Sequence, residues 1–188
     1  TVHFNHLNFD NELLIYAMRW YTDKNLKMIN NKKIDLATEY FNKAFQLHMS
    51  GKSKDAIEAY KKSIDYYPTP KAHTYLGWAF SLNGRFDEAI NQCKIAIDLN
   101  PDYGNPYNDI GSYLINLDQF DEAIYWLEKA IKAPDYEPRH FPYYNLGRIY
   151  EKKGDWYSAL HNYSEALKLN PDYELAKNAF VRLTAMMN

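Results

Sequence analysis

The chain has 188 residues, of which 24% are charged, and its net charge is −2. A near-neutral balance in which acids and bases alternate disfavours a nucleic-acid-binding surface, and no apolar run is long enough to span a bilayer. The single cysteine, Cys93, excludes an internal disulfide framework. We therefore expect a cytoplasmic protein without nucleic-acid partners or membrane insertion, in which Cys93 is an inert core thiol on an apolar helical stripe.

The first 36 residues are predicted to form an N-terminal helical segment and a connector. His3 and His6 stand close together, but nothing nearby completes a set of metal ligands, and a frayed terminus is expected. Asp10 or Asn11 can cap a helix. The helix that follows carries a broad apolar stripe, made of Leu13, Leu14, Ala17, Met18 and Tyr21, with Trp20 beside it.

The polar, asparagine-rich stretch 23–33 is predicted to be a connector, with a short helical turn around 26–29. The apolar stripe before it has to be buried somewhere. It can pack on the open face of the first repeat, fill a concave groove or pair with a second molecule, and the sequence leaves these alternatives open. It also leaves open whether residues upstream of Thr1 were removed.

From residue 37 onward the chain repeats itself with a period near 34 residues. Gly77, Gly111 and Gly147 stand 34 and 36 residues apart, and the alanines that follow them keep the same spacing. A self-similar period of this size is typical of stacked repeat architectures. Each unit contains two segments with helical periodicity, so the sequence predicts a series of helical hairpins.

Small residues explain how the two helices of a hairpin pack. A glycine inside a helix costs about 1 kcal/mol relative to alanine, and Gly77 offsets this cost if it lies against Ala89 and lets the helices approach closely. Asn83 and Gly84 supply the turn between them, and Pro101 ends the second helix. One hairpin cannot bury its apolar face alone, so neighbouring units form the core.

These residues resemble the tetratricopeptide repeat family, whose aromatic–Leu-Gly–aromatic–Ala–aromatic–Ala–Pro order recurs in three units. The second unit has Leu76-Gly77-x-x-Phe80, Ala89, Cys93, Ala96 and Pro101. The third has Tyr107-x-x-Ile110-Gly111-x-x-Leu114, Ala123, Leu127 and Ala130. The fourth has Tyr143-x-x-Leu146-Gly147-x-x-Tyr150, Ala159, Tyr163, Ala166 and Pro171. The first is degenerate, with Tyr40, Ala44, Leu47, Gly51, Ala56, Tyr60 and Pro68, and with Ser63 in place of an alanine.

The resemblance implies an all-α, right-handed superhelical solenoid. Its four helix-turn-helix units occupy 37–69, 70–103, 104–139 and 140–173, and 174–188 forms a C-terminal capping helix with a polar outer face. Thr69-Pro70 and Asn105-Pro106 are expected to start helices. The connection from Ala133 to Pro142 is longer than the family period and rich in proline and aromatic residues, so it is either a contact site or a packing adjustment.

No nucleophile motif, metal-ligand spacing or phosphate-binding loop appears in the chain. We therefore expect neither an enzyme nor a cofactor or metal site, and turn to binding. In the tetratricopeptide repeat family the first helix of each hairpin lines a concave groove. By that resemblance the groove receives Phe41, Asn42, Phe45, Tyr75, Trp78, Asn108, Asp109, Ser112, Tyr144, Asn145 and Arg148.

The family's clamp for an acidic chaperone tail needs two lysines, an arginine and two asparagines. Here those positions hold Phe41, Phe45, Tyr75, Asn105 and Asp109, so such a tail is disfavoured. Asparagine amides can both donate to and accept from an extended backbone, and aromatic side chains can anchor it.

The sequence therefore predicts a protein- or peptide-binding module that acts as an adaptor, scaffold or chaperone. In one alternative, the N-terminal helix covers the groove aromatics. In another, the chain is a self-assembling scaffold whose homo-oligomer forms through that helix or the repeat ends.

Overall fold

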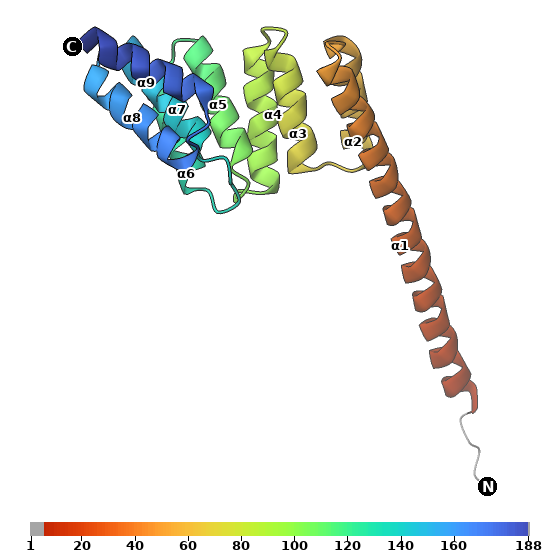
Figure 1. Cartoon of the computed structure of the whole chain (residues 1–188). Helices are drawn as coiled ribbons and strands as arrows, with labels where there is room; N and C mark the ends of the chain where they lie inside the picture. Colours follow the sequence, from red (N-terminus) through yellow and green to blue (C-terminus); the bar gives the residue numbers. More distant parts are fainter. Residues whose placement is uncertain (1–5, 188) are drawn as a thin grey trace.

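The computed structural model describes the backbone of residues 6–187 and the side chains of residues 14–187. Within this part the chain forms a row of helical hairpins from which one long helix projects (Figure 1). The helices are α1 (His6–Met49), α2 (Ser53–Tyr66), α3 (Pro70–Ser81), α4 (Phe86–Leu99), α5 (Asn105–Asn116), α6 (Phe120–Lys132), α7 (His140–Lys152), α8 (Trp156–Leu169) and α9 (Glu174–Met187). The predicted all-α repeat solenoid is confirmed.

Each hairpin pairs two consecutive helices, and each packs on the next. The C-terminal part of α1 pairs with α2, then α3 with α4, α5 with α6 and α7 with α8, while α9 packs on α8. The first helices of successive hairpins also touch, α3 with α5 and α5 with α7. Because the first helices crowd together, the stack curves toward them, and we call their shared surface the concave face.

Gly77 lies where the two helices of the second hairpin approach closely. A β-carbon at this position would lie 2.9 Å from the Ala89 carbonyl oxygen and 3.2 Å from the Cys93 sulfur. Ala89 and Cys93 are fully buried, and burial raises the pKa of the Cys93 thiol well above its ordinary value. The predicted close approach and the buried position of Cys93 are thus observed.

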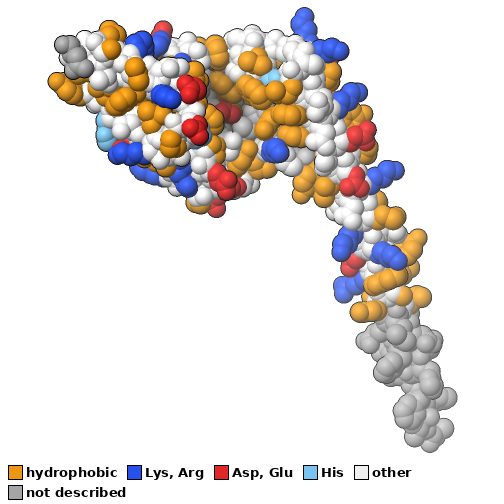
Figure 2. All heavy atoms as spheres, in the orientation of Figure 1, with side chains coloured by type: hydrophobic (Ala, Val, Ile, Leu, Met, Phe, Trp, Pro, Cys, Tyr) orange, Lys and Arg blue, Asp and Glu red, His pale blue; other side chains and the backbone are white. Residues whose placement is uncertain are grey.

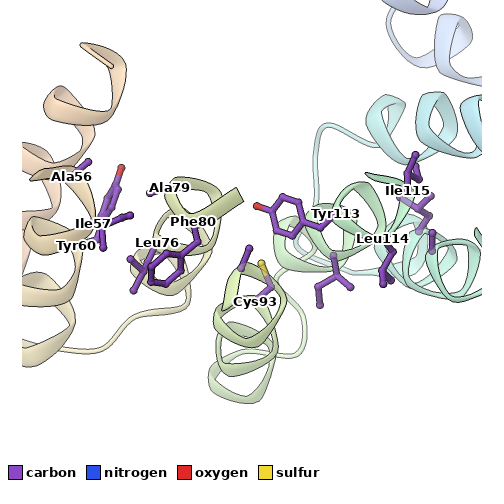
Figure 3. Packing of buried hydrophobic residues seen from close by; sticks show 14 of the residues in the cluster. Ala56, Ile57, Tyr60, Leu76, Ala79, Phe80, Cys93, Tyr113, Leu114 and Ile115 are labelled. Atoms are coloured by element: carbon purple, nitrogen blue, oxygen red, sulfur yellow. The ribbon is translucent and has the colours of Figure 1, made fainter. Parts of the chain in front are cut away.

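The core continues along the stack without a break between hairpins. Figure 3 shows the buried side chains following one another from Ala56 and Tyr60 to Leu114 and Ile115. Each helix from α2 to α8 therefore contributes surface to two interfaces. A single hairpin would leave one of these exposed, which is why the repeats are stable only together.

The N-terminal helix differs from the prediction. The expected connector 23–33 is part of α1, which is uninterrupted and begins at His6, upstream of the predicted caps at Asp10 and Asn11. No glycine or proline occurs between His6 and Met49, so nothing in the backbone stops a helix once the first hairpin has nucleated it. The predictions for His3 and for the Leu13 side chain lie outside the described residues.

The long connection from Ala133 to Pro142 is an ordered packing element. Tyr136 is 2% exposed and lies against Gly104, where a β-carbon would meet the tyrosine β-carbon at 2.2 Å. The Gly104 amide donates to the Asp135 carbonyl at 2.9 Å, and the Asp135 amide donates to the Asp102 carbonyl at 3.0 Å. Of the two alternatives for this connection, these contacts favour a packing adjustment.

Two smaller predictions at helix ends have different outcomes. The Thr69 hydroxyl accepts from the Ala72 amide at 3.1 Å, as a capping residue should. In contrast, α5 is capped by Gly104 rather than Asn105, because only a residue without a side chain fits beside Tyr136. In α9 the apolar side chains of Leu175, Val181 and Met186 are exposed, so the predicted polar outer face of this helix is not uniformly polar.

Candidate functional site: the concave face

Four aromatic side chains from two neighbouring hairpins form a cluster at the N-terminal end of the concave face. Phe41 and Phe45 come from α1, and Tyr75 and Trp78 come from α3. The Tyr75 ring centre lies 5.2 Å from that of Phe41, 5.9 Å from that of Phe45 and 5.9 Å from that of Trp78. All four side chains are half-buried. We call them the aromatic cluster, and each keeps part of its ring available at the surface.

His48 packs against the Trp78 ring of this cluster, and it is not among the site residues predicted from the sequence. Its ring is 5% exposed and lies 4.0 Å from the Trp78 ring, centre to centre. Its Nδ1 faces the Tyr60 hydroxyl at 3.4 Å, while its Nε2 is buried without a hydrogen-bond partner. Burial lowers the pKa of His48, so the ring is held neutral under Trp78. In the sequence, the only sign that His48 contacts the aromatic cluster is that it follows Phe45 by about one helical turn.

A row of polar side chains crosses from α5 to α7. The Asn145 amide donates to the Asn108 side-chain oxygen at 3.1 Å, and the Arg148 guanidinium donates to the Asn145 side-chain oxygen at 3.1 Å. Both asparagines are buried, at 9% and 6% exposure. These amides, predicted to contact an extended segment, therefore already satisfy each other across two hairpins.

The remaining predicted residues of α5 and α7 occupy different surroundings. Asp109 is half-buried near Tyr113 of the same helix and Cys93 of α4, and burial raises its pKa to about 7. Ser112 is half-buried on α5. Tyr144 packs its ring 5.8 Å from Tyr163, against the far end of the stack. The polar half of the predicted site is thus largely engaged in internal contacts.

The two ends of the concave face are hollowed. At the N-terminal end a cavity of about 330 Å³ lies beside the aromatic cluster, and exposed Asn42 lines it together with Ile34, Phe41, Tyr67 and Lys71. At the C-terminal end a cavity of about 410 Å³ lies between α7, α8 and α9. Arg148 and Arg182 line it, but the Arg182 guanidinium is paired with Glu151 at 2.7 Å.

The projecting part of α1 does not cover the concave face. Its large apolar residues from Leu14 to Ile34 are exposed, and the helix extends away from the hairpins (Figure 2). The alternative in which this helix shields Phe41, Phe45 and Trp78 is therefore not the arrangement found. Among the residues with described side chains, no three His, Cys, Asp or Glu side chains gather into a metal-binding group. In the same part of the chain no helix has both the length and the apolar content needed to cross a bilayer.

Stacked helical hairpins with a lined concave face define a class of protein–protein interaction modules. Two family models described as tetratricopeptide repeat match the chain, one over residues 70–103 and 141–173 and the other over 105–135. The chain belongs to the tetratricopeptide repeat family, whose members are in general non-enzymatic interaction modules. The predicted membership is confirmed.

Curated relatives match only parts of the chain. It is 34% identical over 79 residues to the small glutamine-rich tetratricopeptide repeat-containing protein 2 of Mycosarcoma maydis, which is 42% of this chain and 22% of that protein. It is 30% identical over 118 residues to the uncharacterized protein ycf37 of Guillardia theta, which is 60% of this chain and 65% of that protein. The chain therefore spans less than two thirds of the length of either relative.

Solved structures share the fold at low identity. The structure described for Pseudomonas aeruginosa pilF superposes with a TM-score of 0.76 at 18% identity, covering 83% of this chain and 71% of that one. YrrB, described as a TPR protein with an unusual peptide-binding site, superposes with a TM-score of 0.62 at 23% identity, covering 93% and 87%. At these identities the likeness concerns the fold alone.

Proposed function

We propose that this chain is a non-enzymatic adaptor that binds an extended peptide segment of a protein partner on its concave face, with the aromatic cluster as the anchor point. The observation that carries the proposal is the cluster itself, since four half-buried aromatic side chains from α1 and α3 meet at a surface that no other part of the described chain covers. Such partly exposed aromatic groups are typical centres of binding energy.

The surroundings of the cluster indicate which partner residues fit. The amino group of Lys71 lies 5.1 Å from the centre of the Phe41 ring and 5.9 Å from that of Tyr75. An apolar side chain can occupy the cavity beside Phe41, with an acidic group of the same segment close to Lys71. The peptide-binding site reported for the structural neighbour YrrB is consistent with this mode of action.

The polar row has a different role in this proposal from that of the aromatic cluster. Because the Asn145 amide already bonds Asn108 and Arg148, we assign it the task of fixing α5 against α7. Replacing Asn145 with alanine would leave buried polar atoms without partners, which costs about 1–3 kcal/mol. A variant at this position therefore changes the framework and cannot by itself report on binding.

The proposal is tested with peptides selected from a display library on the wild-type protein. Their dissociation constants are then measured by fluorescence anisotropy for Trp78→Ala, Phe45→Ala and the matched control Tyr125→Ala. Tyr125 lies on α6, which is the second helix of its hairpin, and it is 51% exposed. We expect the Trp78 and Phe45 variants to weaken binding by about tenfold or more and the Tyr125 variant to leave it unchanged. Equal affinity in all four proteins would refute the aromatic cluster as the anchor.

Self-assembly, the other function predicted from the sequence, concerns a different surface. It does not compete with peptide binding, because the projecting part of α1 lies away from the aromatic cluster.

A further inference from the structure

One half of α1 has no partner within the described part of the chain. Between Leu14 and Ile29 the helix makes no contact with the hairpins, and its apolar side chains are more than half exposed (Figure 2). Soluble proteins rarely leave so many large apolar groups in water, and contiguous exposed patches of this kind mark interaction sites. The remaining question is which partner covers the exposed patch on α1.

Most of the large apolar side chains of this half of α1 lie on one side of the helix, whereas Tyr16 and Trp20 lie on the other. At 100° per residue, seven of them fall within an arc of about 160°: Leu14, Ile15, Met18, Tyr21, Leu26, Met28 and Ile29. We call this set the α1 face. Thr22 and Asn25 are the other residues of the arc, so it carries no charge over more than four helical turns. The four charged residues of the same segment lie outside the arc: Arg19 borders it about 20° beyond Leu26, Lys24 lies about 40° beyond Met28, and Asp23 and Lys27 are on the opposite side.

The α1 face itself carries no charged side chain. Lys24, which lies just outside it, places its amino group 4.8 Å from the centre of the Trp20 ring. A charge-free apolar face is what a second apolar helix requires.

The size of the α1 face fits pairing of two copies. Seven large side chains that are more than half exposed present on the order of 100 Å² each, or roughly 700 Å² per copy. Two copies together reach about 1,400 Å², within the range of stable interfaces. Each copy supplies the same face, so the contact closes on itself and requires no other component.

We propose that the α1 face pairs with the α1 face of a second copy in antiparallel orientation, giving a homodimer. The direction follows from Lys32 and Lys33, which continue the same side of the helix just beyond Ile29. Parallel pairing would bring the four lysine side chains of the two copies together, and their repulsion disfavours it. Antiparallel pairing places the two lysine pairs at opposite ends of the interface.

The mass of the full chain tests the pairing. Wild-type protein, Met18→Glu and Tyr16→Glu are compared by analytical ultracentrifugation up to about 100 µM. Met18 belongs to the α1 face, whereas Tyr16 is equally apolar, 74% exposed and on the opposite side, so it is the matched control. We expect dimers for the wild-type and Tyr16→Glu proteins and a monomer for Met18→Glu, with the same helicity in all three.

Two results would overturn the proposal. One is a wild-type monomer over the whole concentration range, and the other is dimers of equal stability in all three proteins. A wild-type monomer that binds vesicles of phosphatidylglycerol and phosphatidylcholine, and loses this binding in Met18→Glu, would assign the α1 face to a membrane instead.

Cysteine cross-linking tests the direction. In the antiparallel register centred on this stretch, Met18 of one copy faces Asn25 of the second copy near the middle of the face, so an equimolar mixture of Met18→Cys and Asn25→Cys should oxidise to mixed disulfide dimers. Cross-links that join only like with like would show parallel pairing and refute the antiparallel arrangement. The native thiol of Cys93 is buried and does not interfere.

Discussion

The charge of Asp109 is costly to the fold. Burial raises its pKa from 3.8 to about 7, and the Asn108 side chain only partly opposes this shift. Between these two values the folded protein keeps the proton that the unfolded chain releases. The free energy of unfolding therefore falls as the pH rises from about 4 to about 7 and is level above that range.

Replacing Asp109 with asparagine removes this cost while keeping the size of the side chain. At 1.36 kcal/mol per pKa unit, a shift of about 3 units corresponds to roughly 4 kcal/mol. Because Asp109 is only half-buried, solvent screening reduces this value. We expect Asp109→Asn to raise the free energy of unfolding by about 1–3 kcal/mol at pH 8 and by less than about 0.5 kcal/mol at pH 4.

The assay is urea denaturation followed by circular dichroism at both pH values. Asp98→Asn, an exposed carboxylate on α4, serves as the control and should change little at either pH. A gain for Asp109→Asn that is the same at pH 4 and pH 8 would show that the effect is not the charge. No gain at pH 8 would show that the carboxylate is adequately solvated in the fold.

Two further predictions concern the framework. Gly104→Ala should lower the free energy of unfolding by about 2 kcal/mol or more, because its β-carbon would overlap Tyr136; urea denaturation measures this, and an unchanged midpoint would mean that the long connection moves aside easily. Asp118→Gly should raise the free energy of unfolding by about 0.5 kcal/mol, and with it the melting temperature. Asp118 has a φ of 55°, where the corresponding turn residue Gly84 has 71°, and the exposed ion pair of Asp118 with Lys152 contributes little. A lower melting temperature would show that this pair outweighs the backbone strain.

The repeat could be predicted from the sequence because the residues that form its helix–helix contacts recur with a fixed spacing. Gly77 and Ala89 lie twelve positions apart in the same hairpin, and the recurrence of both residues reveals which helices approach closely. The glycine turn at Gly84 is equally local. Such short-range patterns determine the hairpin, and stacking follows from the apolar faces that each hairpin leaves exposed.

The polar part of the candidate site could not be predicted in the same way. Asn108 and Asn145 stand 37 residues apart. The sequence does not distinguish an asparagine that bonds another asparagine within the fold from one that is free to bind a partner protein. The insertion of Tyr136 against Gly104 is also long-range. The prediction of a connector at 23–33 is wrong because polar composition alone does not stop a helix that contains no glycine or proline.

Because α1 is continuous, it also fixes the distance between its projecting end and the first hairpin. Leu14 and Ala37 are separated by about 35 Å at 1.5 Å per residue, and no glycine or proline lies between them. A flexible tether lets its two ends sample many separations, whereas this helix holds them at one length and one angle. A ligand engaged by the aromatic cluster and a molecule held at the tip of α1 are therefore kept at a set spacing, and only pairs whose own geometry matches that spacing gain from binding both ends at once.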